Sequence, residues 1–326
     1  MLRTLVCGLV AVASICAQTP TRLPGLVPQV HAAASAADFA TAGRLLAEYK
    51  TAHGATPEYI EAFSWIGRGQ LQASHLGEAE ENAAEVRKLC ESELKRRALD
   101  AEPHLPIALG ASIEVAASGL AKQGQRDQAV VLLRDEIKRW HGTSITMRLQ
   151  KNLNLLTLEG KPAPLLDVAE GLGERKPLPL ASHRGHPVLL FLWAHWCPDC
   201  KKEVAIVAKL EEVYGPKGLV VVAPTQHYGY VARGEEATRA RETQYMAEVF
   251  NQYYAALGKV EVPVSEANFE RYGVSTTPTM VLVDGQGIVR MYNPGAADYE
   301  TLAAKIDAMV RPAHSDVTSA LRKASH

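Results

Sequence analysis

Two hydrophobic patterns divide the chain. Between residues 32 and 158, apolar side chains recur at helical spacing, as at Val130, Leu133 and Ile137, so that they share one helix face. Short breaks that contain glycine or proline, such as the one at Gly54, interrupt this pattern several times. The pattern predicts about five to seven helices in antiparallel pairs.

Two of these predicted helix pairs resemble tetratricopeptide hairpins. The residues that carry the resemblance are Phe63, Gly67 and Ala79 in one pair and Ile113, Gly124 and Ala129 in the other. The two matching alanines are 50 positions apart, whereas tetratricopeptide repeats recur about every 34 residues. A plain helical bundle explains residues 32–158 equally well, and either arrangement supplies a docking surface or a packing partner for a second domain.

A glycine and two prolines mark the end of the helical pattern: Gly160, Pro162 and Pro164. A helix does not easily continue through such a segment. Beyond it, the pattern predicts strands at 187–193, 219–223, 279–283 and 288–292 and helices at 201–214 and 298–310. The predicted fold class is an all-α helical-hairpin domain over residues 32–158, followed by an α/β domain with a mixed central sheet over residues 159–312.

The N-terminus has the pattern of a secretory signal peptide. Arg3 precedes an apolar run of 11 residues and then small residues, and this run is shorter than the roughly 20 residues of a membrane span. We predict a signal peptide at 1–17, a linker at 18–31 and a tail at 313–326. The mature chain is then exported to the periplasm or another extracytoplasmic site, with no transmembrane segment. Lipid anchoring through Cys16 is the alternative.

Charge and cysteine content narrow the class of partner. The chain has 35 basic and 36 acidic residues. Its net charge is therefore too small to attract nucleic acid or an anionic membrane surface. Removing the signal peptide leaves Cys90, Cys197 and Cys200, too few for a scaffold held by disulfides. Cys90 is expected to act as a small apolar side chain on a helix. The close pair, Cys197 and Cys200, indicates redox chemistry with protein partners.

The close cysteine pair stands where a predicted strand gives way to a helix. Cys197 is the expected N-cap and Pro198 the first helical residue, a position that tolerates the missing N–H of proline. Unpaired backbone donors and the helix dipole there favour a thiolate, which is the attacking species in disulfide exchange. Cys200 lies one turn further on, within reach of Cys197. Trp196 adjoins the nucleophile and offers an apolar face to a partner.

The segments around this pair resemble the thioredoxin superfamily and, within it, the exported TlpA/ResA-like thiol-disulfide oxidoreductases. The resemblance covers about residues 159–310 and is carried by the segments 160–164, 184–190, 193–200 and 273–279. It implies a thioredoxin-like fold for residues 159–312 and an enzyme that needs no cofactor. It also implies exported, disulfide-containing protein substrates and a membrane protein as electron donor.

The resemblance also assigns roles to single residues. Cys197 would be the nucleophile and Cys200 the resolving thiol. Pro278 would follow a cis bond, with Thr277 offering backbone groups to an extended substrate strand. Glu203 matches a glutamate that would move a proton for Cys200, and an ordinary solvated helix charge is the alternative for it.

The chain departs from the thioredoxin pattern in two places. Phe191 stands where cytoplasmic thioredoxins have a buried aspartate, so any carboxylate for proton transfer must come from Glu203. Residues 225–260 form an insertion with a helix expected at about 235–257. Its tip at 226–230 either borders the site or is a solvated surface excursion, which is the simpler expectation. His195 is expected to be a surface neighbour of the cysteines rather than a catalyst.

Three other functions compete with disulfide exchange. A zinc site would combine His183 and His186 with the cysteines, but a strand of about 23 Å separates the two pairs. A peroxiredoxin would have threonine where this chain has Ala194. The third is a non-enzymatic interaction protein that works through its helices. The intact cysteine pair argues against it, and the sequence therefore favours a reductase of protein disulfides.

The first prediction concerns the redox potential. Asp199 lies two residues after Cys197, and its negative charge disfavours a thiolate at Cys197. The positive charges of Lys201 and Lys202 favour that thiolate. We expect Asp199→His to stabilise the thiolate and raise the potential by roughly a few tens of millivolts, since about 30 mV corresponds to 1.4 kcal/mol. Equilibration of both proteins with glutathione measures the difference. An unchanged or lower potential would remove the charge argument for a reductase.

Overall fold

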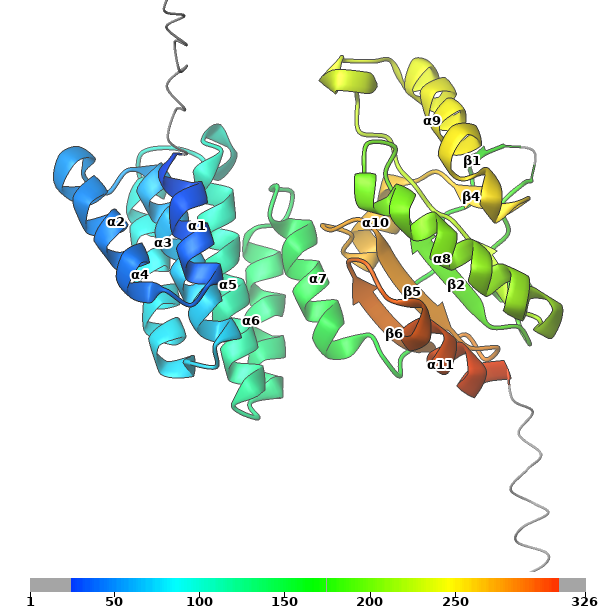
Figure 1. The fold of residues 1–326 in the computed structure, drawn as a ribbon, viewed down its shortest axis with the longest axis horizontal. Helices are drawn as coiled ribbons and strands as arrows, with labels where there is room; N and C mark the ends of the chain where they lie inside the picture. Colours follow the sequence, from blue (N-terminus) through cyan, green and yellow to red (C-terminus); the bar gives the residue numbers. More distant parts are fainter. Residues whose placement is uncertain (1–24, 174, 311–326) are drawn as a thin grey trace, which may run out of the picture.

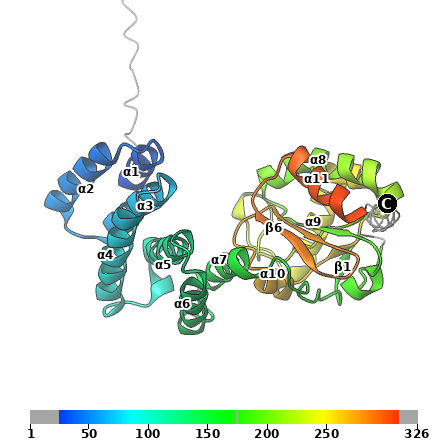
Figure 2. The ribbon, with the colours of Figure 1, turned by 90° about the horizontal axis from the view of Figure 1, so that it is seen from below.

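The computed structural model describes residues 25–173 and 175–310, which form a helical half and an α/β half (Figure 1). Three predictions lie outside these residues: the signal peptide at 1–17, the lipidation alternative at Cys16 and the tail at 313–326. Helix α7 lies between the other helices and the α/β half in both ribbon views (Figures 1 and 2).

The helical half is built from consecutive helices that pack against their neighbours. Within residues 25–157 these are α1 (Leu26–Ser35), α2 (Phe39–His53), α3 (Pro57–Gln72), α4 (Leu76–Leu94), the short 3-10 helix η1 (Leu99–Ala101), α5 (His104–Lys122), α6 (Arg126–Arg139) and α7 (Thr146–Thr157). Helix α5 packs against α3, α4, α6 and α7. Among the described helices it alone has the length and hydropathy of a membrane span, and its central position explains that composition.

Local sequence signals set several helix starts. The side chains of Asp38 and Thr56 accept backbone N–H groups at the beginnings of α2 and α3, which satisfies donors that the helices leave free. The predicted linker at 18–31 is wrong over its last residues, because α1 begins at Leu26. Pro28 is compatible with this helix since it lies in the first turn, where the missing N–H has no helical acceptor.

The α/β half contains a four-stranded mixed sheet in the order β3-β2-β5-β6, with β2 parallel to β3 and antiparallel to β5. A separate pair, β1 and β4, is antiparallel. The elements are β1 (Gly171–Leu172), η2 (Leu180–His183), β2 (Val188–Leu192), α8 (Pro198–Tyr214), η3 (Gly215–Lys217), β3 (Val220–Val222), η4 (Ala232–Gly234), α9 (Arg239–Tyr253), η5 (Ala255–Leu257), β4 (Val262–Pro263), α10 (Glu266–Tyr272), β5 (Thr279–Val283), β6 (Val289–Pro294) and α11 (Tyr299–Val310).

These elements confirm the predicted fold class, a helical N-terminal region followed by a thioredoxin-like α/β region with a mixed sheet. The four predicted strands correspond to β2, β3, β5 and β6, each within two residues of its predicted ends. The sequence did not predict β1, β4 or α10, because strands of two residues and a helix of seven are too short to show a period.

Strand β2 is buried on both faces. Leu189 and Phe191 point into a core shared with α8, α9 and α11, while Val188, Leu190 and Leu192 point into a core shared with α10. Successive side chains of a strand alternate between the two faces. A continuous apolar run, rather than an alternating one, is therefore what this position in the sheet requires.

Helix α7 joins the halves. It packs against α10 and β6, and the side-chain amide of Asn154 donates to the carbonyl of Arg271 at 3.4 Å. Gly273, which ends α10 in a left-handed conformation with φ +61°, lies so close to α7 that an added Cβ would collide with the backbone of Gln150 and Lys151. Glycine at position 273 therefore allows both the turn and the close approach of the two halves.

We expect Gly273→Ala to lower the free energy of unfolding by about 2 to 5 kcal/mol, the sum of left-handed strain and overpacking against α7. Gly124→Ala is the matched control, since Gly124 also has a positive φ, +81°, but has open space around its Cβ position. The control should lose only about 1 to 2 kcal/mol. Equal losses in urea unfolding would show that the contact with α7 contributes nothing.

Candidate active site

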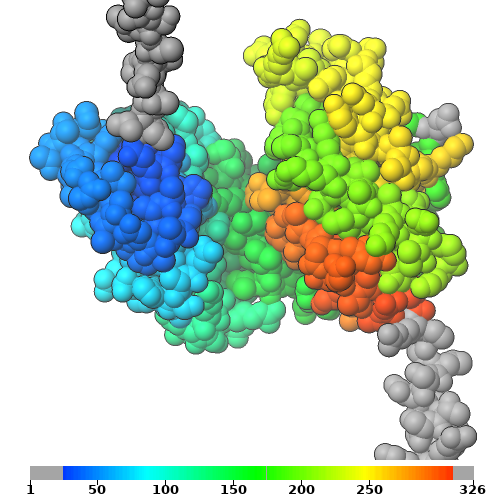
Figure 3. All heavy atoms as spheres, in the orientation of Figure 1, coloured from blue at the N-terminus to red at the C-terminus, as the bar shows by residue number. Residues whose placement is uncertain are grey.

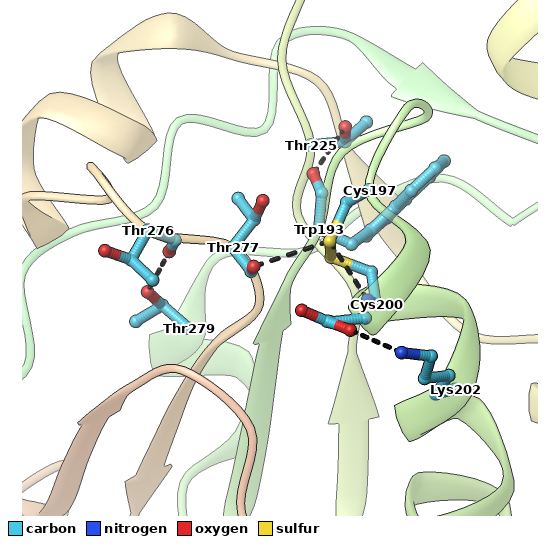
Figure 4. Close-up of a disulfide and its surroundings, with 9 residues drawn as sticks. Trp193, Cys197, Cys200, Lys202, Thr225, Thr276, Thr277 and Thr279 are labelled. Atoms are coloured by element: carbon cyan, nitrogen blue, oxygen red, sulfur yellow. Dashed lines mark hydrogen bonds and ion pairs between the residues drawn. A yellow bond between two sulfur atoms is a disulfide. The ribbon is translucent and has the colours of Figure 1, made fainter. Parts of the chain in front are cut away.

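The candidate site lies where β2 ends and α8 begins (Figure 4). Trp193 extends the strand into the core, and its indole N–H donates to the carbonyl of Ala223 at 3.0 Å. The hydroxyl of Thr225 donates to the carbonyl of Trp193 at 2.9 Å. These two bonds tie the segment before the cysteines to the end of β3, so the loop leaves the sheet in one fixed direction.

Cys197 is the N-cap of α8 and Pro198 its first residue, as the sequence predicts. The backbone N–H of Cys200 donates to the Cys197 sulfur at 3.0 Å. The two sulfurs are bonded as a disulfide, with their Cα atoms 5.3 Å apart. When the bond is reduced, the Cys197 sulfur faces a backbone donor and the positive end of the helix dipole, both of which favour its thiolate.

The segment before β5 lies against the disulfide. The Thr277–Pro278 peptide bond is cis, and the carbonyl oxygen of Thr277 is 3.4 Å from the Cys197 sulfur (Figure 4). The hydroxyl of Thr279 donates to the carbonyl of Thr276 at 2.7 Å and holds the turn. Thr277 is half-buried and Pro278 is buried, so this turn presents backbone beside the sulfur at the edge of the site.

Glu203 is buried, with 8% of its surface exposed, and lies one helical turn after Cys200 on α8. The alternative of a solvated helix charge is therefore wrong. Burial raises the pKa of its carboxyl, while the backbone N–H of Ala297 acts in the opposite direction. Its Oε2 atom has no hydrogen-bond partner among the described residues, which leaves it free to exchange a proton.

Two charged side chains flank the start of α8 on its exposed side. The carboxylate of Asp199 accepts from the Lys202 ammonium at 2.9 Å, and both side chains are mostly exposed. Solvent screens such a pair strongly. The negative charge of Asp199 is therefore partly compensated at its own position in the helix.

Trp196 is the exposed aromatic of the site, with 47% of its surface open. Its indole ring meets the ring of Tyr228 edge to face, with the centroids 5.6 Å apart. Tyr228 belongs to the tip of the 225–260 insertion. The tip therefore borders the site, and the simpler expectation of a solvated excursion is wrong.

The insertion is held by a buried pair that the sequence did not reveal. His195 and Glu242 are each 1% exposed, and the His195 Nε2 atom is 3.2 Å from the Glu242 carboxylate. The same carboxylate accepts the backbone N–H groups of Tyr228 and Gly229 at 2.6 and 2.9 Å. Burial lowers the pKa of His195. His195 is thus a core residue, which corrects the expectation of a surface neighbour.

No local pattern in the sequence marks this pair, because the two residues are 47 positions apart and a single glutamate in a polar helix is typical of a solvated charge. The insertion also packs on the core through Phe250 of α9 and Tyr254 just after it, whose rings lie 5.7 and 4.4 Å from that of Trp193. In residues 25–173 and 175–310, no group of three or more histidine, cysteine, aspartate or glutamate side chains could hold a metal ion.

Comparisons with known proteins agree with this geometry. The family model for a thioredoxin-like domain matches residues 177–309. The chain is 30% identical over 156 residues to the thiol:disulfide interchange protein DsbE of Pseudomonas fluorescens biotype C, covering 46% of this chain and 77% of that protein. It is 27% identical over 149 residues to the thioredoxin-like protein YneN of Bacillus subtilis (strain 168), and the match covers 46% of this chain and 79% of that protein.

A third relative is the thiol-disulfide oxidoreductase ResA of Bacillus thuringiensis (strain Al Hakam). It is 28% identical over 130 residues, which cover 40% of this chain and 66% of that protein.

The raised pKa of Glu203 leads to a stability prediction. Because the fold disfavours the charged carboxylate, wild-type stability falls as pH rises from the ordinary pKa of 4.5 to the raised one. A glutamine side chain cannot ionise. The free energy of unfolding of the Glu203→Gln variant, relative to that of the wild type, should therefore be higher at pH 7 than at pH 4. Urea unfolding at both pH values measures this.

The matched control is Glu212→Gln, at an exposed glutamate of the same helix, which should show the same difference from wild type at both pH values. If the stability of Glu203→Gln relative to the wild type does not increase with pH, burial does not disfavour the charged form of this carboxylate.

Proposed function

Because the chain belongs to the thioredoxin-like thiol-disulfide oxidoreductases that include DsbE and ResA, we propose that it reduces disulfide bonds of exported proteins. One observation carries the proposal. The Cys197 sulfur caps α8, accepts the N–H of Cys200 and forms a disulfide with the Cys200 sulfur. A pair with this geometry can alternate between dithiol and disulfide without a cofactor.

The first step is attack by the Cys197 thiolate on one sulfur of a substrate disulfide. A bond forms between Cys197 and that sulfur, and the second substrate sulfur leaves as a thiolate that takes up a proton. The N–H of Cys200 stabilises the attacking thiolate before the step.

The second step releases the substrate. Cys200 loses its proton and attacks the Cys197 sulfur, which restores the disulfide of the enzyme and frees the first substrate sulfur as a thiol. In sum, the enzyme gives up two electrons and two protons. Glu203 is the proposed proton acceptor for Cys200. It lies one turn away, its pKa is raised by burial, and its Oε2 atom has no hydrogen-bond partner among the described residues.

Three residues form the proposed substrate contact. Thr277 and Pro278 offer an extended backbone edge beside the sulfur, on which a substrate segment adds as a strand. Trp196 supplies an exposed apolar face next to the nucleophile. Its contact with Tyr228 fixes the orientation of that face.

The direction of the reaction and the place where it occurs are also proposals. The negative charge of Asp199 near Cys197 disfavours the thiolate and so favours a reducing pair, although Lys202 offsets part of this effect. Reduced enzyme must then be restored by an electron donor, for which we propose a membrane protein. The signal-like N-terminus supports export to the periplasm after removal of residues 1–17.

We further propose that the helical half, from the start of α1 at Leu26 to residue 158, is a separate tetratricopeptide-like domain and that residues 159–312 are the redox domain. Helix α7 ends at Thr157 and the redox region follows it directly, which supports a boundary near position 159.

The cysteine assignments make a reactivity prediction. When the reduced protein is alkylated with limiting iodoacetamide, Cys197 should be modified first, because it is the thiol at the helix start. Cys90 should be slowest, since it is fully buried and burial raises the pKa of its thiol to about 12. Mass spectrometry of the peptides gives the order. Faster reaction at Cys200 would reverse the roles of nucleophile and resolving thiol.

Reduction of insulin by the full chain, with dithiothreitol as electron source, tests the function itself. Activity should disappear in Cys197→Ser. A Cys200→Ser variant should instead accumulate a mixed disulfide with the substrate, because the resolving step is blocked. A wild-type protein with no activity above dithiothreitol alone would favour the alternative of a non-enzymatic interaction protein.

A further inference from the structure

A cleft of about 630 Å³ opens where the two halves meet. Its walls come from α3, α5 and α7 of the helical half and from the turn before β5 of the α/β half; the lining residues are Arg68, Leu71, Gln72, Glu114, Ser118, Lys122, Arg148, Lys151, Ser275 and Thr276. The space-filling view shows the molecule hollowed between these halves (Figure 3). The volume lies within the range of about 300 to 1,000 Å³ that is usual for ligand sites.

The cleft has an excess of positive charge. Four of its side chains are cationic and one is a carboxylate, that of Glu114. Arg148 donates to this carboxylate at 2.9 Å, Lys151 lies 3.6 Å from it and Arg68 3.9 Å. Lys122 donates to the carbonyl of Leu71. Within the cleft, the carboxylate of Glu114 therefore faces three cations, and outside it the carboxylate of Glu61 also acts on Arg68.

Two donors of these cations have no acceptor in the part of the chain that the structure describes. The Nε atom of Arg68 and one terminal nitrogen of Arg148, Nη2, are buried and lack a hydrogen-bond partner among the described residues. Desolvation lowers the pKa of Arg68. The exposed parts of the two side chains, 23% for Arg68 and 16% for Arg148, are what a ligand in the cleft can meet. A carboxylate is the acceptor that matches the geometry of a guanidinium best.

The cleft adjoins the redox site. Thr276 lines it, and the next residue, Thr277, has its carbonyl 3.4 Å from the Cys197 sulfur. An extended chain advances about 3.3 Å per residue. A polypeptide whose cysteine meets Cys197 therefore brings the residues a few positions away from that cysteine to the mouth of the cleft.

We propose that the cleft binds an acidic stretch of the substrate polypeptide, with aspartate or glutamate side chains paired to the four cations of the cleft. The inference rests on the proposed function, and it names the class of substrate: a disulfide-containing protein with carboxylates close to the reactive cysteine. Residues of both halves form the cleft, so the helical half takes part in selecting what Cys197 reduces.

The test uses the reduced full chain with Cys200→Ser and synthetic peptides that hold one cysteine as a mixed disulfide with thionitrobenzoate. Attack by Cys197 on the peptide sulfur forms the enzyme–peptide disulfide and releases coloured thionitrobenzoate. One peptide has glutamates on both sides of the cysteine, and the other has glutamines at the same positions. The measured quantity is the ratio of the two second-order rate constants, acidic over neutral, at low ionic strength.

We expect a ratio of about ten, because clefts of complementary charge raise association rates by about 10-fold to 10³-fold. The double variant Lys122→Gln with Lys151→Gln should bring the ratio close to one. The matched control is Lys88→Gln with Lys138→Gln, which removes the same charge at exposed positions of α4 and α6 outside the cleft. That control should keep the ratio of the parent protein.

The double variant could lose its fold, because Lys151 is largely buried beside Glu114. A third variant therefore tests the same inference without changing a buried side chain. Ser275→Glu adds a carboxylate at an exposed position of the cleft and should also lower the ratio. A parent ratio near one, or a raised ratio that neither Ser275→Glu nor the double variant lowers, overturns the inference. If neither peptide reacts, the proposed function itself fails, whereas equal reaction of both peptides removes only the acidic substrate class.

Discussion

The pairing of β2 with β5 is the constraint on which the rest of the site depends. The strands are antiparallel, and Leu192 at the end of β2 lies opposite Thr279 at the start of β5. The loop after β2 and the turn before β5 therefore meet at one edge of the sheet, and Thr277 comes to lie against the Cys197 sulfur. A slip of one residue would turn the apolar faces of β2 over, and its burial on both faces opposes that slip.

The third segment at this edge comes from β3, which runs parallel to β2. Thr225 follows it and donates to the carbonyl of Trp193, and the insertion begins there. Glu242 then returns from α9 to hold the tip of the insertion and His195 together. One buried carboxylate thereby places Tyr228 against Trp196, so the aromatic rim of the site depends on a residue remote from the cysteines in sequence.

The helical half contributes to the same region from the other side. Helix α7 reaches the α/β half because glycine at position 273 leaves room for its backbone. This close approach brings the cations of α3, α5 and α7 beside the turn that precedes the cis bond. The redox chemistry belongs to one half of the molecule, and the charged surface next to it belongs mainly to the other.

The sequence by itself determined the fold class and the cysteine pair, because both are local. Periodicity of 3.6 or 2 residues reports the helices and strands directly, and the spacing of Cys197 and Cys200 at a helix start needs only one turn of chain. The start of α1 at Leu26 is not predicted, because Pro20, Pro24 and Pro28 are typical of a linker. Proline is nevertheless tolerated in a first helical turn.

Only the tertiary structure decided the burial of His195, Glu203 and Glu242 and the charged cleft between the halves. A single histidine or glutamate looks the same in a sequence whether water or protein surrounds it. Its environment comes from elements far away along the chain, such as α9 for His195 and the segment after β6 for Glu203. Because burial depends on these distant contacts and not on neighbouring residues, no local pattern encodes it.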